Sequence, residues 1–269
     1  MVTPLLSNQV VIISYSIIIK SYLSFHTYQT SHKLSIAFVS SNPSIPPEGS
    51  LLNNIHALTD TERLYTEATQ ALATPYGKEY TWEVKVGCMG MKGPQAAQHI
   101  IDSLDLPLSV SEYLEQIAKH YNALFPTAKL LPGAERLVRH LHKHNIPIAI
   151  ASGGAQDSFD LKTTNHRDLV SLFGHVVLAS SDPEVTKGKP EPDVFLVCAR
   201  RFPDNPDPSK CLVFEDAPNG VQAGVAAGMQ VVMVPDSRLS SELTKGATEV
   251  LASLEDFKPE RYGLPPFDD

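Results

Sequence analysis

The sequence predicts an α/β fold with a parallel sheet, and three observations predict it. Short apolar runs that suit buried strands recur at 146–151, 176–179 and 211–214. A polar motif follows each of these runs, and the carboxyl ends of parallel strands are where open sheets keep their ligands. Residues 60–132 instead carry apolar side chains at helical spacing. We therefore expect a mainly helical insertion ahead of an alternating α/β region.

The first fifty residues differ in character from the rest. Residues 10–19 form an apolar run rich in β-branched side chains, which favours a strand over a helix. A membrane helix needs ~20 apolar residues, so this run is short for one, and no basic segment precedes it as in a signal peptide. A membrane anchor is therefore the less favoured interpretation. Residues 34–39 are a second strand candidate, and the prolines and glycine between 43 and 49 predict a loop.

Helical spacing is clearest over 62–73 and 94–104. Ser109 and Glu112 have the spacing of a capping box, which predicts a helix from there through Leu124.

The helix expected over 133–144 carries three histidines. His140 and His144 are four residues apart and can share one face, whereas His142 cannot. A metal site is one interpretation, but no carboxylate or cysteine nearby in the sequence completes it. A solvated basic face is the favoured interpretation.

Two motifs suit the binding of a phosphoryl group. Ser152 and Gly153 directly follow an apolar run, so one hydroxyl and several backbone N–H groups can meet an anion there. Lys187 and Lys189 lie in a loop rich in glycine and proline, and either can supply a point positive charge.

A pair of carboxylates follows the run 211–214. Glu215 and Asp216 at the end of a strand suit a hard cation with oxygen ligands, such as Mg²⁺. Asn219 lies three residues after Asp216, where its side chain can orient the groups around the metal, cap the helix expected from Val221, or do both.

The order of hydroxyl, lysine and paired acids resembles the haloacid dehalogenase-like phosphatase superfamily. The match extends from Asp60 to the C-terminus and is densest in Lys189–Asp193, Cys211–Val221, Ala226–Pro235 and Tyr262–Pro265. The resemblance implies a Rossmann-like core with a helical cap, here 133–269 and 60–132. It also implies Mg²⁺-dependent hydrolysis of a small phosphomonoester, a nucleoside monophosphate such as pseudouridine 5'-phosphate, through an aspartyl phosphate. By the same resemblance Ser152 and Lys189 hold phosphate, and Asp216 is favoured over Glu215 as the direct metal ligand.

The chain departs from the family where the reaction begins. Members carry Asp-x-Asp-Gly at the end of the first strand, followed after three residues by Asp-Thr-Glu, which is Asp60–Glu62 here. Counting back places Asn53 at the nucleophile and Ile55 at the acid/base position. Neither an amide nor an isoleucine can do that chemistry. We therefore expect an impaired catalyst with a weakened Mg²⁺ site, or alternatively a non-catalytic isoform that binds phosphate or a partner.

Residues 1–50 must then supply a replacement for the central first strand. Our hypothesis is that 34–39 fills that place, with 10–19 as an extra strand or a disordered tail. The alternative is that the whole segment before Asp60 comes from a different exon or a mistaken gene model.

Composition limits the remaining classes of function. A net charge of -8 argues against a nucleic-acid surface, and the absence of dinucleotide or Walker-type glycine motifs argues against NAD and ATP chemistry. Three cysteines without metal spacing are typical of reduced thiols, so we expect a cytoplasmic location.

Overall fold

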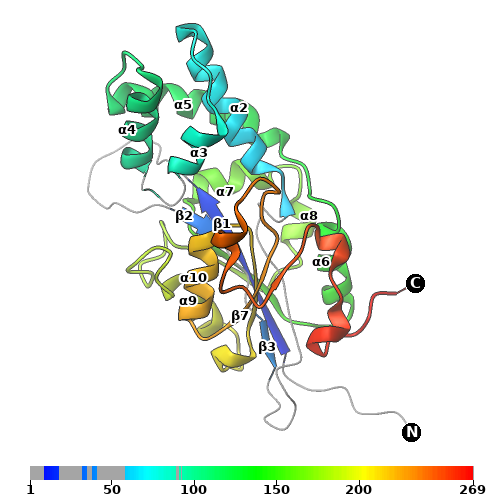
Figure 1. Ribbon diagram of the computed structural model, residues 1–269. Coiled ribbons are helices and arrows are strands. Elements are labelled where there is room, and N and C mark those ends of the chain that lie inside the picture. The colour runs from blue at the N-terminus through cyan, green and yellow to red at the C-terminus, as the bar shows by residue number, and fades with distance from the viewer. Residues whose placement is uncertain are drawn as a thin grey trace, which may run out of the picture.

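The computed structural model describes residues 9–17, 32–34, 38–40, 58–88, 91 and 93–268. For the first three stretches it describes the backbone only. Figure 1 shows a strand-rich lower part and a group of helices above it.

The lower part is built on parallel strands, as the sequence predicts. β4 (Ile148–Ser152) pairs in parallel with β5 (His175–Leu178) on one edge and with β1 (Gln9–Ile17) on the other. A second run of parallel strands has the order β6 (Leu212–Glu215), β7 (Gln230–Met233) and β8 (Glu249–Val250). β1 contacts β6 and thereby lies between the two sets of strands.

β1 occupies the central place that we expected the run 34–39 to fill. Leu34 ends the short strand β2 (His32–Leu34), and β3 (Phe38–Ser40) begins four residues later. Both short strands pair antiparallel to β1. The physical reason is length, because nine consecutive residues rich in valine and isoleucine can match the whole of β4, whereas a strand of three cannot.

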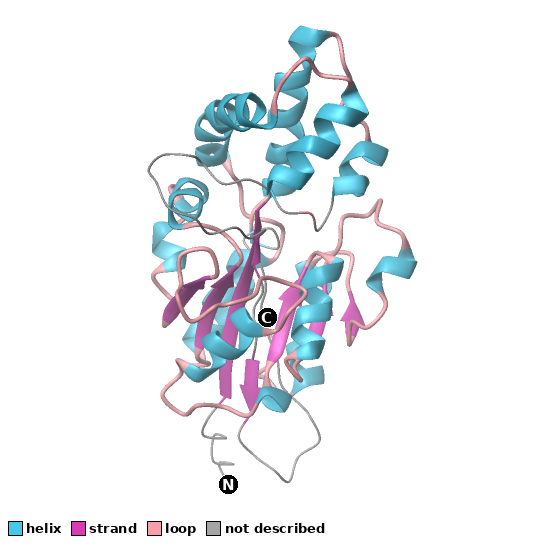
Figure 2. Cartoon of the chain, turned by 90° about the vertical axis from the view of Figure 1, so that its left-hand side faces the viewer, coloured by secondary structure: helices cyan, strands magenta, loops and turns pink. Residues whose placement is uncertain are grey.

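Helices flank the sheet (Figure 2). The core of this part includes three aromatic side chains with 0% exposure: Phe195 of α9, Phe214 of β6 and Phe257. The helices of this part are α6 (Ala134–Lys143), α7 (Gln156–Thr163), α8 (Arg167–Val170), α9 (Asp193–Arg200) and α10 (Pro218–Ala226).

The upper group of helices is the predicted cap. Ser109 forms the predicted capping box with Glu112. Tyr65, Tyr121 and Phe125 form an aromatic cluster with ring centroids 4.6–5.1 Å apart, which gives the cap a core of its own. The helices are α2 (Thr61–Ala73), α3 (Trp82–Cys88), α4 (Gly93–Leu104) and α5 (Val110–Leu124).

Two linkers join the cap to the core and run side by side. Thr59 and Leu130 form an antiparallel bridge, and Asp60 N donates to the carbonyl oxygen of Lys129 at 2.8 Å. Within the described residues, none of the helices combines the length and the apolar character needed to cross a bilayer.

We expect Val11→Pro to destabilise the chain by about 1–3 kcal/mol, because Val11 pairs with Ile148 on one edge and Phe38 on the other. Proline removes a backbone donor that one of these neighbours uses. Gln9→Pro is the matched control, since proline is tolerated at the first residue of a strand. Urea unfolding measures both variants, and equal midpoints would contradict the central placement of β1.

Candidate active site

A buried ion pair joins the lysine loop to the acidic strand end. Lys189 Nζ donates to Glu215 Oε1 at 2.9 Å, and their side chains are 2% and 0% exposed. The ammonium also lies 4.9 Å from the centroid of the Phe195 ring. A buried charge needs such a partner because its desolvation is otherwise uncompensated. The sequence motifs at 189 and 215 are therefore one structural unit.

The second oxygen of Glu215 holds the turn into α10. Glu215 Oε2 accepts hydrogen bonds from the backbone N–H groups of Asp216 at 2.9 Å and Ala217 at 3.1 Å. Gly220 packs directly on this carboxylate, since a Cβ placed there would lie 1.7 Å from Oε1. The glycine of the acidic motif thus allows the first turn of α10 to approach the buried glutamate.

Ser152 is the last residue of β4 and is fully buried. Its Oγ accepts a hydrogen bond from Gly154 N at 2.8 Å, so the turn after the strand folds back over the hydroxyl. Gly153 is buried in this turn. The turn lies at the carboxyl end of β4, as expected for a ligand site in a parallel sheet.

Asp216 faces a cation that our sequence analysis missed. Lys162 on α7 is 1% exposed, and its Nζ donates to Tyr65 Oη at 2.7 Å. The ammonium lies 4.4 Å from the ring centroids of both Tyr65 and Phe125. Burial lowers the pKa of Lys162 well below its ordinary value, and the negative charge of Asp216 opposes that shift. A lysine three residues after Phe159, on its buried face, was the available signal.

The loop that carries Lys189 is held by Asp193. Asp193 Oδ2 accepts from the backbone N–H of Thr186 at 3.1 Å and of Lys187 at 2.9 Å. Lys187 itself points outward, with a 66% exposed side chain 3.6 Å from Glu191. Of the two lysines, Lys189 is therefore the one directed into the site.

Asn219 does not cap the helix. α10 begins at Pro218 with Ala217 in the N-cap position, so Asn219 lies inside the first turn. It is half-buried and one residue before the glycine that contacts Glu215. The capping role that the sequence suggested for Asn219 is wrong, because proline already supplies the first helical residue.

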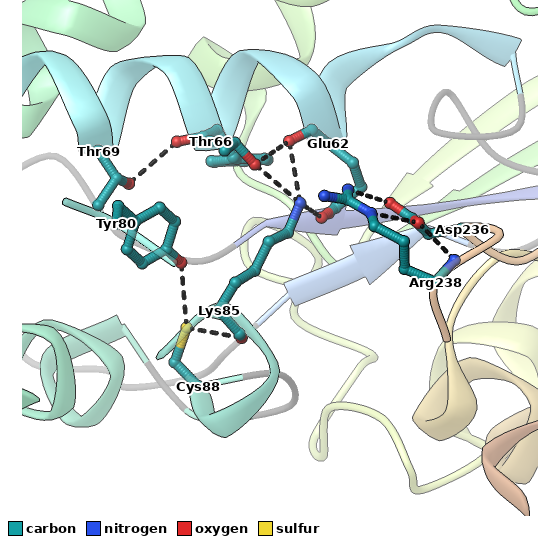
Figure 3. Close-up of polar contacts among 9 residues, drawn as sticks. Glu62, Thr66, Thr69, Tyr80, Lys85, Cys88, Asp236 and Arg238 are labelled. Carbon is teal, nitrogen blue, oxygen red and sulfur yellow. Dashed lines mark hydrogen bonds and ion pairs between the residues drawn. The ribbon is translucent and has the colours of Figure 1, made fainter. Parts of the chain in front are cut away.

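The cap contributes a third buried lysine, Lys85 (Figure 3). Lys85 is 5% exposed and lies 2.9 Å from the carboxylate of Glu62. Its Nζ also donates to Thr66 Oγ1 at 2.9 Å and to the Glu62 carbonyl at 3.1 Å. These bonds fix α3 against α2.

Arg238 of the core also contacts the cap. The Arg238 guanidinium lies 4.1 Å from the centroid of the Trp82 ring. It donates to Asp236 at 2.7 Å (Figure 3). Hydrogen bonding to Arg238 lowers the pKa of Asp236, so that carboxylate stays charged beneath the cap.

Asp60, the acid nearest to the missing motif, belongs to the linker. Its Oδ1 accepts from Lys129 N at 2.8 Å, and its Oδ2 accepts from Arg63 Nε at 2.8 Å. Asn53 and Ile55 lie outside the described residues. In the sheet, the residue of β1 that pairs with Ser152 is Tyr15, and residues 1–47 contain no aspartate or glutamate.

We expect Glu215→Gln to lower the free energy of unfolding by about 3–5 kcal/mol, because it leaves the Lys189 ammonium buried without its counter-charge. Urea denaturation measures the loss. The control is Glu115→Gln, which breaks an ion pair with Lys119 whose side chains are 74% and 69% exposed and should cost less than about 1 kcal/mol. If the double variant Lys189→Met/Glu215→Gln loses as much free energy of unfolding as the two single variants together, the two residues are not coupled.

Lys162 predicts a slope of stability against pH. The pKa of Lys162 is about 10.4 in the unfolded chain and lies well below that value in the folded chain. Between these two pKa values the unfolded chain therefore binds more protons than the folded chain. Stability contributed at this site is therefore greatest above the unfolded pKa and falls as the pH decreases toward the folded pKa. Lys162→Met should remove this slope in urea unfolding measured between neutral and alkaline pH. The surface variant Lys119→Met should keep it.

Comparison with known proteins gives the family. The model of the haloacid dehalogenase-like hydrolases matches residues 48–228. The chain is 54% identical over 212 residues to a probable pseudouridine-5'-phosphatase of Drosophila melanogaster, which covers 79% of this chain and 92% of the relative. It is 51% identical over 215 residues to (DL)-glycerol-3-phosphatase 1, mitochondrial, of Arabidopsis thaliana, which covers 79% and 72%.

Solved structures agree in fold. A crystal structure of a putative beta-phosphoglucomutase from Thermotoga maritima superposes with a TM-score of 0.61 at 26% identity, covering 74% of this chain and 91% of that one. A HAD family hydrolase from Deinococcus radiodurans gives a TM-score of 0.65 at 24% identity, covering 78% and 93%. The buried lysine–glutamate pair at the carboxyl ends of parallel strands, the helical cap and these matches lead to one conclusion: the chain belongs to the haloacid dehalogenase-like hydrolase family.

Proposed function

We propose that the chain binds a small phosphomonoester at the carboxyl edge of its sheet and hydrolyses it far more slowly than intact phosphatases of its family. The observation that carries this proposal is the pairing of Tyr15 with Ser152 in the sheet. Tyr15 belongs to residues 1–47, which contain no carboxylate, whereas Lys189, Glu215 and Asp216 are all retained.

The retained residues support phosphate binding. The hydroxyl of Ser152 and the glycine turn after it offer hydrogen-bond donors, and Lys189 is a positive charge fixed by Glu215. Fixed donors and charges bind the phosphoryl group and stabilise charge that develops on its oxygens.

The missing carboxylates explain the expected loss of turnover. In this family an aspartate attacks phosphorus and a second aspartate protonates the leaving oxygen. The family match covers residues 48–228, a range that contains Asn53 and Ile55. This supports the assignment of these two residues to the motif, which rests on their spacing from Asp60. In a serine protease, removal of the nucleophile costs on the order of 10⁶ in turnover. Asp60 is a poor substitute because Arg63 and the Lys129 N–H already bind its carboxylate.

The cation that the family implies is Mg²⁺, and the donors present fit it in part. Asp216 supplies a half-buried carboxylate at the strand end. Both Glu215 oxygens accept hydrogen bonds from other groups, which favours Asp216 as the direct ligand. A bound Mg²⁺ neutralises charge on a phosphoryl oxygen. Without the first-strand aspartate we expect weak binding, and Asn219 contributes at most an amide near the site.

The substrate class rests on the relatives. One is named a probable pseudouridine-5'-phosphatase and another a glycerol-3-phosphatase. We propose pseudouridine 5'-phosphate or a related nucleoside monophosphate as the first ligand to test. The second candidate function is a non-catalytic isoform that binds phosphate. The complete burial of the Lys189–Glu215 pair favours it, because a buried ion pair contributes to the fold whether or not the chain is catalytically active.

The purified chain should show phosphate-dependent thermal stabilisation but turnover orders of magnitude below the Drosophila relative, with Mg²⁺ and either p-nitrophenyl phosphate or pseudouridine 5'-phosphate. Ser152→Ala should lose most of the stabilisation by phosphate, whereas Ser171→Ala, on the exposed end of α8, should not. Turnover equal to that of the Drosophila relative would contradict the proposed loss of catalytic activity.

The triple change Asn53→Asp, Ile55→Asp and His56→Gly restores the family motif at its spacing from Asp60. We expect it to raise the turnover of aryl phosphate by at least about 10³-fold, provided that this stretch can displace β1 from the sheet. The matched control adds only Ile55→Asp, which supplies an acid/base without a nucleophile. If the triple variant stays as inactive as the control, β1 holds the central place and the motif cannot be restored by sequence alone.

A further inference from the structure

A cluster of two histidines and one aspartate lies at the edge of the core remote from the candidate active site. His140 is on α6, His144 directly follows that helix, and Asp268 comes from the C-terminal segment. α6 leads into the amino end of β4, whereas Ser152 is at the carboxyl end of that strand. The cluster and the phosphate site therefore belong to opposite ends of the sheet.

The ligand atoms of this cluster gather on one side. One nitrogen of each histidine and a carboxylate oxygen of Asp268 all lie within 4.8 Å of one another. Histidines four residues apart on a helix share a face and can bind one metal ion together. The sequence offered no acid for this pair, and the fold supplies one from 124 residues further along, counting from His144 to Asp268.

His140 is arranged as a metal-binding histidine is. Its Nε2 is 2.9 Å from the carbonyl oxygen of Pro265, so this nitrogen carries the proton and donates it there. The other nitrogen, Nδ1, is then a lone pair that faces Asp268 Oδ2 at 3.9 Å. A backbone carbonyl that accepts from the far nitrogen is the usual way in which proteins fix the tautomer of a metal ligand.

Two buried nitrogens of the cluster lack hydrogen-bond partners. Among the described residues, His140 Nδ1 and His144 Nε2 are buried atoms with none. The side chain of His140 is only 3% exposed, so water does not readily serve it. Burial lowers the pKa of His140, which keeps the imidazole neutral and its lone pair available. An unpaired buried acceptor is costly, and a cation would satisfy both nitrogens at once.

The space beside the cluster can accept an ion. A pocket of about 250 Å³ opens beside His140 and Asp268, and its other lining residues are Arg136, Arg139, Lys143 and Phe267. Each of its three cationic side chains has a partner. Arg136 lies 4.0 Å from the centroid of the Phe267 ring, and Arg139 pairs with Glu135 and Asp168. Lys143 Nζ donates to Asp268 Oδ2 at 2.9 Å. A carboxylate has about four lone-pair sites, so Asp268 can meet Lys143 and a metal together.

From this geometry we propose that His140, His144 and Asp268 bind one divalent transition-metal ion of the Zn²⁺ class, with Nδ1, Nε2 and a carboxylate oxygen as ligands. Two imidazoles and one carboxylate suit Zn²⁺ and not Mg²⁺. Zinc ligands at about 2.0–2.1 Å from the ion lie about 3.3 Å apart. The separation of 3.9 Å between His140 Nδ1 and Asp268 Oδ2 therefore has to shorten by about 0.6 Å, and the widest separation in the cluster by at most about 1.5 Å. The ion ties the C-terminal segment to α6, where the Phe267 ring already lies against His140 with centroids 4.8 Å apart in a tilted arrangement.

The test uses the full chain without a polyhistidine tag, freed of metal with a chelator and titrated with Zn²⁺. We expect one equivalent bound by calorimetry and a rise in melting temperature. His144→Ala and Asp268→Asn should each weaken binding at least about tenfold, as loss of a ligand does. Both side chains are partly exposed, so the apo variants should melt close to the unmodified apo chain.

His142→Ala is the matched control, because this histidine is exposed on another face of α6 and should leave Zn²⁺ affinity unchanged. Asp216→Asn should also leave it unchanged, which separates this site from the Mg²⁺ site. The three cysteines are buried and do not compete. Binding that survives His144→Ala, or that His142→Ala weakens equally, would overturn the proposal, as would Mg²⁺ that displaces Zn²⁺ at comparable concentration.

Discussion

The contact between Lys189 and Glu215 is the interaction on which the rest of the site depends. It joins a loop to a strand end inside the protein, where an unpaired charge of either sign would be costly. Because Glu215 also accepts from Asp216 N and Ala217 N, the same carboxylate sets the direction of Asp216 and the start of α10. Charge, turn geometry and helix placement are thus fixed by one buried side chain.

This arrangement separates binding from bond cleavage. The groups that we propose to receive a phosphoryl oxygen come from β4, the 186–193 loop and β6. The groups that would attack phosphorus belong in this family to the first strand. We propose that the pocket can persist without turnover, since the contacts that stabilise it come from other elements.

The sequence predicted the strands at 148–152, 175–178 and 212–215 to within two residues, because each is a short apolar run with a polar motif after it. Ser152 and the acidic pair followed from their places at strand ends, and the family pattern favoured Lys189 over Lys187. Lys162 was missed, since its partner Tyr65 is 97 residues away and only the fold brings the two together. The same holds for Asp268, whose distance along the chain hid the group that completes the histidine pair. The choice of 10–19 over 34–39 for the central strand depended on pairing length, which periodicity does not reveal.

The paired linkers at Thr59 and Leu130 have a mechanical consequence. Two strands of chain held side by side by backbone hydrogen bonds, and braced by the Asp60 carboxylate across Lys129 N and Arg63, resist sliding and stretching. The movement that costs least free energy is then a hinge rotation about an axis that crosses both linkers. We therefore expect the four-helix lobe to swing as a single flap over the sheet, with Arg238 and Trp82 meeting at the side where the flap comes to rest.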